Sequence, residues 1–137
     1  MGLTRTEAYG IAYNAHRLFT FGQVARARRI MEGLVVMNPK EAYFQALLGG
    51  ICGRMGDEDE ALKRYTKALK IDPANLTARV NRADLYLRRG TLDAALDDLI
   101  AATKLDPKGK TPLGKRARTL ARSTASALHA ALKKRRK

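Results

Sequence analysis

The chain has 137 residues, 45% of them hydrophobic, which is enough for one modest domain with a buried core, and no apolar run approaches the ~20 residues of a membrane-spanning helix. Its formal net charge is +14, and its single cysteine, Cys52, excludes an internal disulfide and a cysteine-based metal site. The N-terminal sequence MGLTRTEAYG lacks the basic patch and apolar stretch of a secretory signal, so we expect a cytoplasmic protein.

The positive charge is concentrated at the C-terminal end. Residues 1–107 hold 16 Lys and Arg and all 13 Asp and Glu, whereas residues 108–137 hold 11 Lys and Arg and no acid. The sequence therefore consists of a nearly balanced body and a strongly basic tail.

A period of 34 residues runs through the body. Glycines at 22, 56 and 90, alanines at 27, 61 and 95, and prolines at 39, 73 and 107 all share it. Glycine permits a turn with positive φ, alanine lets neighbouring helices approach closely, and proline ends a helix. Each unit is therefore predicted to be a helix A, a glycine-centred turn, a helix B and a proline-terminated turn.

The pattern places the helices in chain order. Thr4 and Glu7 have the spacing of a capping box at the first helix start, and Thr111 with Pro112 is a good N-cap and first-turn pair for the last helix. The expected repeat helices span 4–20 and 24–37, 41–55 and 58–71, and 75–89 and 92–105. The last helix has an apolar stripe of Leu113, Ala117, Leu120, Ala121, Thr124, Leu128, Ala131 and Leu132.

This pattern resembles the tetratricopeptide repeat. The second repeat, LLGGICGRMGDEDEALKRYTKALKIDP, matches best, with the Leu48-Gly49 pair, Tyr65 and Pro73 at the family's positions. The resemblance implies an all-α, right-handed superhelical solenoid. We expect residues 1–109 to hold three repeats (about 8–41, 42–75 and 76–109) and residues 110–137 to form a basic amphipathic capping helix and tail.

A closer resemblance is to the small three-repeat chaperones of type III secretion translocators. It rests on the run LFTFGQVARARRIMEGLVVMNPKEAYFQALLGGICGRMGDEDEAL and on the trailing helix. In those chaperones a groove holds an unfolded segment of the translocator in the cytoplasm, so the resemblance implies a protein or peptide partner, such as a secreted or assembly protein. Those chaperones are usually acidic, whereas this chain is basic. A homodimer through an N-terminal helix is a further expectation.

Catalysis is not expected from these residues. His16 and His129 lie in different helices, and neither a nucleophile elbow nor a His-Glu-x-x-His motif is present. Cys52 falls on a helix-packing face and is expected to be a small core residue. The acidic run at 57–60 opens a helix, where carboxylates interact favourably with the helix dipole. We therefore expect no cofactor and no metal.

With catalysis not expected, the remaining function is peptide binding, and we expect it to occur on the A helices. Residues off the A/B packing face should line a concave groove, where the carboxylate clamp of Lys, Asn and Arg known from the family is missing. Small and apolar side chains replace it, which favours an extended or helical segment with apolar side chains. The alternative is that several of these side chains pack against each other. The candidate groove residues are Tyr9, Ala12, His16, Phe19, Tyr43, Ala46, Gly50, Gly53, Arg54, Thr77, Val80, Asp84, Leu87 and Arg88.

The basic tail has four interpretations, which the sequence leaves open. It is a solvated cap, a docking site for an acidic protein, a phosphate-binding element for nucleic acid, or a contact for an anionic membrane surface without insertion. The leading hypothesis is a non-catalytic adaptor or chaperone, and the alternative is a nucleic-acid-associated or anionic-surface-binding protein that acts through the tail. The tail residues are Lys115, Arg116, Arg118, Arg122, Lys133, Lys134, Arg135, Arg136 and Lys137.

Overall fold

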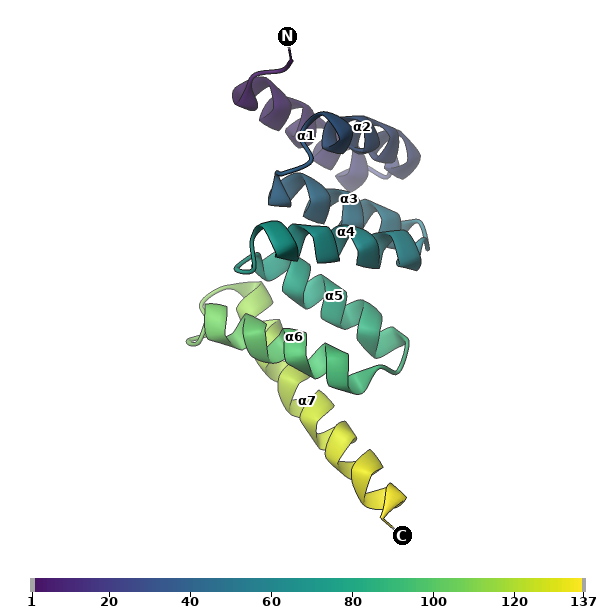
Figure 1. The fold of residues 1–137 in the computed structure, drawn as a ribbon, viewed down its shortest axis with the longest axis vertical. Helices are drawn as coiled ribbons and strands as arrows, with labels where there is room; N and C mark the ends of the chain where they lie inside the picture. Colours follow the sequence, from purple (N-terminus) through teal and green to yellow (C-terminus); the bar gives the residue numbers. More distant parts are fainter. Residues whose placement is uncertain (1, 137) are drawn as a thin grey trace. The chain divides into compact units, whose positions relative to one another are not determined.

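A computed structural model describes residues 2–136, and every regular element in that range is a helix (Figure 1). The predicted all-α fold is confirmed, with paired helices like three tetratricopeptide repeats followed by a seventh helix. The six repeat helices begin and end within one residue of the expected bounds. The helices are α1 (Arg5–Thr20), α2 (Val24–Met37), α3 (Ala42–Arg54), α4 (Glu58–Ile71), α5 (Leu76–Arg88), α6 (Leu92–Leu105) and α7 (Pro112–Arg135).

The chain forms two compact units, which are described separately. Unit 1 comprises α1 to α4 and ends at Asn75, and unit 2 comprises α5 to α7 and begins at Leu76. In unit 1, α1 packs on α2, α2 on α3, and α3 on α4. In unit 2, α6 packs on both α5 and α7.

Local chemistry explains why the helices stop where they do. Gly22, Gly56 and Gly90, in the three A-to-B turns, have φ between +75° and +89°, which residues with a Cβ rarely adopt. Each B helix ends two residues before a proline, as at Ile71 before Pro73. The residue between them leaves the helical region because a following proline disfavours it. The capping box at Thr4 and Glu7 is present as predicted.

In the second helix pair a small residue of α3 faces a large residue of α4. Gly49 of α3 lies against the ring of Tyr65 of α4, and a Cβ on Gly49 would stand only 2.6 Å from Cε1 of that ring. Both residues are buried. The tyrosine therefore occupies the volume that a side chain at position 49 would need.

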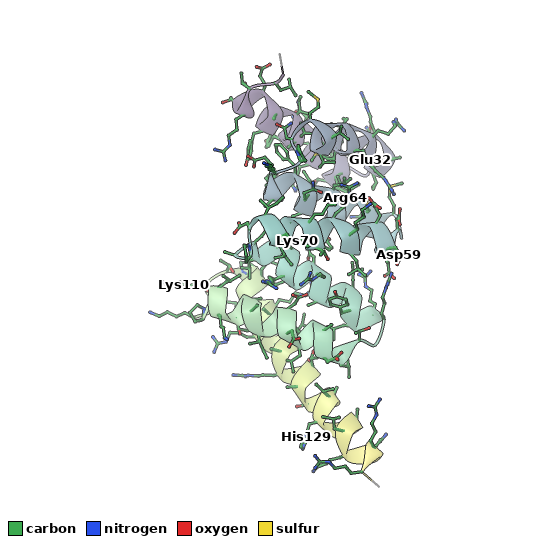
Figure 2. The ribbon with its side chains drawn as sticks, viewed as in Figure 1. Glu32, Asp59, Arg64, Lys70, Lys110 and His129 are labelled. Carbon is green, nitrogen blue, oxygen red and sulfur yellow. The ribbon has the colours of Figure 1, made fainter. Side chains whose placement is uncertain are left out.

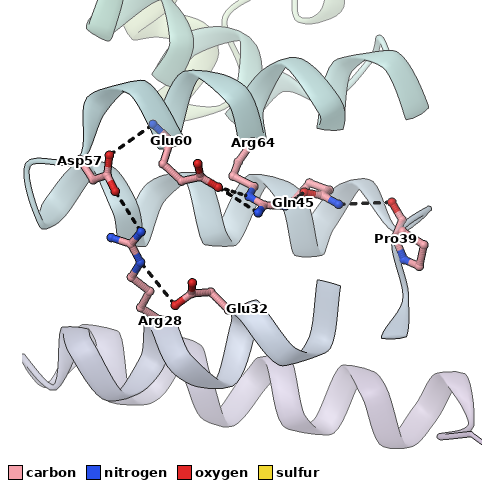
Figure 3. Close-up of polar contacts among 7 residues, drawn as sticks. All are labelled: Arg28, Glu32, Pro39, Gln45, Asp57, Glu60 and Arg64. Atoms are coloured by element: carbon pink, nitrogen blue, oxygen red, sulfur yellow. Dashed lines mark hydrogen bonds and ion pairs between the residues drawn. The ribbon is translucent and has the colours of Figure 1, made fainter. Parts of the chain in front are cut away.

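Charged groups join α2 to α4 at the edge of this core (Figure 3). Arg28 of α2 donates to Oδ2 of Asp57 at 2.9 Å and also pairs with Glu32 of its own helix. Asp57 accepts a hydrogen bond from the backbone N–H of Glu60 and so caps α4. The hydrogen bond from Arg28, followed by the one from Glu60, lowers the pKa of Asp57. This carboxylate therefore links the second helix pair to the first.

A second polar contact lies inside the second helix pair. Arg64 of α4 donates from Nη1 to Oε1 of Gln45 on α3 at 3.2 Å, and from Nε to Glu60 at 2.9 Å. Gln45 is buried, and its Nε2 donates to the carbonyl of Pro39 at 3.3 Å. Figure 3 shows that these bonds tie the first turn of α3 to α4 and to the α2–α3 turn.

Unit 2 has a compact apolar core and one buried charge. Val80, Leu99 and Ala117 meet at its centre, one from each helix. Asp98 of α6 is also buried, and both Arg79 and Arg82 of α5 donate to its carboxylate. A buried carboxylate is stable there because two guanidinium groups satisfy its oxygens.

Asp106 fixes the turn from α6 into α7. Its carboxylate accepts hydrogen bonds from the backbone N–H groups of Lys110 and Thr111, at 3.0 and 2.9 Å, and from the Thr111 hydroxyl at 2.7 Å. The hydroxyl oxygen of Thr111 in turn accepts from the N–H of Gly114, so it caps α7. The same carboxylate leaves no room for a Cβ on Gly114. One acidic side chain therefore sets where the last helix starts.

The turn at Asp106 predicts acid sensitivity. Hydrogen bonds from the Thr111 N–H and hydroxyl, and from the Lys110 N–H, lower the pKa of Asp106 in the folded protein. This stabilisation is present above the unfolded-state pKa of about 4 and is lost as the pH falls through the lower folded-state pKa. Asp106→Asn should therefore show a smaller loss of unfolding free energy between about pH 5 and pH 2 than the natural chain.

Urea unfolding followed by circular dichroism across that pH range measures this difference. Asp97→Asn is the matched control, because Asp97 is exposed on α6. Equal pH slopes for Asp106→Asn and the natural chain would show that the carboxylate does not stabilise this turn.

Candidate binding surfaces

The start of α1 and the start of α3 carry a cluster of aromatic rings. The ring of Tyr9 lies edge-on to Tyr43, with centroids 5.7 Å apart, and 5.0 Å from Phe44. Its hydroxyl donates to Oε2 of Glu41 at 2.7 Å, and the Arg5 guanidinium lies 5.5 Å from its ring centroid. Tyr9 is thus fixed from several sides, as expected for a pre-organised contact surface.

Tyr43 is the exposed member of this cluster. Its side chain is 38% exposed, whereas Phe44 beside it is fully buried. Partial burial, and to a lesser degree the nearby Tyr9, raises the pKa of the Tyr43 phenol. A half-covered tyrosine of this kind offers an apolar ring face together with a neutral hydroxyl.

A second aromatic group lies at the other end of the same two helices. The Arg54 guanidinium of α3 lies 5.5 Å from the ring centroid of Phe19 of α1. His16 is exposed one turn before Phe19, with ring centroids 6.5 Å apart. Between the two groups the half-buried Gly50 presents no side chain. We call the set Tyr9, His16, Phe19, Tyr43, Gly50 and Arg54 the α1–α3 face.

The other candidate groove residues have different positions. Ala12, Ala46 and Val80 are buried, so they support the helices instead of presenting side chains. The ring contacts bring Tyr9 to Tyr43, and the cation–π contact brings Phe19 to Arg54. The candidate groove residues on α5 belong to unit 2. Among them Asp84 and Leu87 are half-buried, and Thr77 and Arg88 are exposed. Gly53 is half-buried on α3.

Asp84, a predicted groove residue, contacts a residue of the predicted basic tail. This candidate groove residue accepts a hydrogen bond from Nη2 of Arg116, a tail residue, at 3.0 Å. Burial raises the pKa of Asp84, and the charges of Arg116 and Arg88 act in the opposite direction. Arg116 is therefore part of the contact that holds α7 on α5.

The remaining tail residues lie on α7 and are exposed throughout. Lys115, Arg118 and Arg122 occupy its first half, and the charges at 133–136 occupy its end, while Lys137 lies outside the described residues. The apolar stripe is buried at Ala117 and Thr124 but exposed at Leu132. The capping function therefore belongs to the first half of the helix.

Sequence reasoning missed some residues of these surfaces. Glu41 and Arg5 position Tyr9. Their role follows from their contacts with Tyr9 in the folded chain, which the sequence pattern does not reveal. Tyr13 and Phe21 are strongly exposed but fall outside the predicted groove phase. Within residues 2–136 no helix is both long and apolar enough to cross a bilayer. The same residues contain no cluster of three or more metal-ligating side chains.

Comparisons with known proteins agree with this architecture. Residues 54–121 match the family model of the tetratricopeptide repeat. Tetratricopeptide repeat protein 36 of Caenorhabditis elegans is 46% identical over 54 residues, which cover 39% of this chain and 30% of that protein. Stress-induced-phosphoprotein 1 of the same organism is 29% identical over 86 residues, or 63% of this chain and 27% of that protein. The chain spans less than a third of these two curated relatives.

The match over residues 54–121 identifies tetratricopeptide repeats in that part of the chain. The fold of the chain matches that of the type III secretion translocator chaperone SycD of Yersinia enterocolitica, with a TM-score of 0.86 at 18% identity, over 93% of this chain and 90% of that one. PcrH, solved in complex with the chaperone-binding region of PopD, gives a TM-score of 0.83 at 20% identity, over 92% and 96%. At these identities the likeness establishes the fold.

Proposed function

We propose that the chain is a non-catalytic adaptor or chaperone that holds an apolar segment of a partner protein on the α1–α3 face. The observation that carries this proposal is the pair of aromatic groups at the two ends of the same helices. Tyr9 with Tyr43 lies at one end, and Phe19 with Arg54 at the other. Small or buried residues separate them, so a chain can approach the backbone there.

The spacing of the two groups suggests the length of the bound segment. Tyr43 and Arg54 are separated by eleven residues of α3, or about 16 Å of helix. An extended segment of about five residues spans that length. Its side chains would alternate, so apolar groups near its two ends would meet the two aromatic groups. Arg54 lies at one end of the face, whereas Arg5 at the other end already pairs with Glu41, so an acidic residue of the segment is favoured at the Arg54 end.

The fold likeness supports the same mode of action. SycD has been solved with a peptide of the translocator YopD, and PcrH with the chaperone-binding regions of PopD and PopB. We propose that this chain likewise acts in the cytoplasm on a partner segment. Residues 1–109 would form the binding body, and residues 110–137 the cap and tail. The solved dimers of SycD support a homodimer as part of this proposal.

Peptide display against the full chain, followed by fluorescence anisotropy with a selected peptide, tests this function. Tyr43→Ala should weaken binding by about tenfold or more, because aromatic anchors dominate such contacts. Phe19→Ala should act in the same direction. Val36→Ala is the matched control, because Val36 is 79% exposed on α2.

Unfolding curves must first show that Tyr43→Ala and Phe19→Ala remain folded. Affinities of these two variants equal to that of Val36→Ala would place the peptide elsewhere and refute the α1–α3 face.

The second candidate function is attachment to nucleic acid or another anionic surface through α7. The exposed cations along that helix favour it. Binding through phosphate contacts should weaken steeply as salt rises, whereas an apolar contact on the α1–α3 face should respond little. Repeating the anisotropy measurement at several salt concentrations separates the two functions.

A further inference from the structure

The last helix has two parts with different surroundings. α7 is 24 residues long, and its first part packs into unit 2 through Ala117 and Thr124, both at most 3% exposed. From Ala125 onward the described side chains are exposed, except for Leu128, which is half-buried. Figure 1 shows the C-terminal part of α7 running past α6, and Figure 2 shows His129 on that part.

The projecting part continues a second apolar seam. Ala121, Ala125, Leu128 and Leu132 follow the 4-3-4 spacing of a helix that pairs with another helix. This set, which we call the free seam, begins at Ala121, which packs against the core of unit 2, and continues through Ala125, Leu128 and Leu132 beyond the docked part of the helix. Leu132 is 48% exposed, and alanines at two of the four positions let another helix approach closely. The seam has no partner within unit 2 along its C-terminal part.

Positive charge lines one flank of the free seam. By helical phase Arg118, Arg122, Lys133 and Arg136 lie on that flank, together with His129. In the range 2–136 no carboxylate pairs with these four cations, in contrast to Arg116, which pairs with Asp84. Arg118 and Arg122 lie one turn apart and repel each other. An acidic partner would relieve this repulsion.

We propose that α7 from Arg118 onward is a docking helix for an acidic amphipathic helix of a partner protein. Apolar side chains of the partner would pack along the free seam, and its carboxylates would pair with the basic flank. A second copy of this chain is a poor occupant, because its helix carries the same charge. Phosphate binding by nucleic acid would use the cations but leave Leu128 and Leu132 without a role. This inference does not depend on the α1–α3 face.

The probe that tests this inference is a fluorescein-labelled synthetic helix of about three heptads, with Leu at a and d and Glu at e and g. Anisotropy titrations use the full chain. Leu128→Ser with Leu132→Ser removes the apolar seam and keeps every charge, and should weaken binding by about tenfold or more. Arg122→Glu with Lys133→Glu should weaken it by a similar factor, and the binding of the natural chain should fall as salt rises.

The matched control is Ala127→Ser with Ala130→Ser. These exposed residues lie on a different face of the same helix, and the two serines reduce helix propensity at neighbouring positions. The control should bind the probe like the natural chain, and circular dichroism should show similar helix content in both serine variants.

Three results would overturn the inference. The first is failure of the natural chain to bind the acidic helix. The second is equal binding by the seam variant and the control, which would make the contact purely electrostatic. The third is tighter binding of a short DNA duplex than of the peptide, unchanged by Leu128→Ser with Leu132→Ser, which would assign the helix to nucleic acid.

Discussion

Replacing Gly49 with alanine is expected to lower the free energy of unfolding by about 2 kcal/mol, although the same change in an open helix interior raises it by about 1 kcal/mol. The added Cβ would lie 2.6 Å from Cε1 and 2.8 Å from Cδ1 of Tyr65. Tyr65 is only 3% exposed, so its ring has no free space into which it can move. Urea unfolding followed by circular dichroism measures the loss.

Gly33→Ala is the matched control for this steric effect. Gly33 also lies inside a helix, α2, but no atom lies within 4 Å of a Cβ built there. The substitution should therefore stabilise the protein by about 0.5–1 kcal/mol, because alanine is the better helix former. Opposite signs for the two glycines are the expected result. A gain in stability for Gly49→Ala would show that the tyrosine ring adjusts without strain.

A compensating change tests the same packing from the other side. The third repeat uses Ala83 where the second has Gly49, and Leu99 where the second has Tyr65, and both of these residues are fully buried. Combining Gly49→Ala with Tyr65→Leu should therefore be less destabilising than the sum of the two single changes.

The positions of the helices were predictable because local residues determine them. Gly22, Gly56 and Gly90 fix the turns through positive φ, and the prolines force the preceding residue out of the helical region. Neither effect depends on the rest of the fold. The periodic pattern therefore predicted the repeat helices to within one residue at each end.

Helical phase was a weaker guide to the candidate site. It placed Ala12 and Val80 on the same faces as Tyr9 and Asp84, yet both are buried. Each A helix packs on more than one neighbour: α1 on α2 and α3, and α5 on α6 and α7. The solvent-exposed face of each A helix is therefore narrower than the face that helical phase alone predicts. The pairing of Asp84 with Arg116 was also out of reach, since 32 residues separate them.

The polar contacts between A and B helices show why repetition does not reveal side-chain partners. One pair of repeat positions holds Gln45 with Arg64 in the second repeat and Arg79 with Asp98 in the third. The first repeat has two isoleucines there, at 11 and 30. The helix geometry is retained while the chemistry changes from apolar to polar to ionic. A single sequence with three repeats gives no means of predicting that change.

The buried contact of Asp98 with Arg79 and Arg82 predicts a second large effect on the free energy of unfolding. Asp98→Ala should lower the free energy of unfolding by about 3 kcal/mol, because removing one member of a buried ion pair leaves the others uncompensated. Arg82 donates to both carboxylate oxygens at 2.7 Å, and Arg79 donates to Oδ1 at 3.0 Å. The two arginine side chains are 16% and 22% exposed, so water compensates part of the loss. This partial hydration places the expected value at the low end of the range for such deletions.

Two variants decide whether the loss comes from uncompensated charge or simply from a cavity. Asp97→Ala, at the neighbouring exposed position, should change the free energy of unfolding by less than about 0.5 kcal/mol. Replacing Asp98, Arg79 and Arg82 together by leucine removes all three charges and makes this contact apolar. If uncompensated charge is the cause, the triple variant should be more stable than Asp98→Ala. A triple variant that is less stable than Asp98→Ala would instead mean that the arginine side chains stabilise unit 2 mainly through their packing.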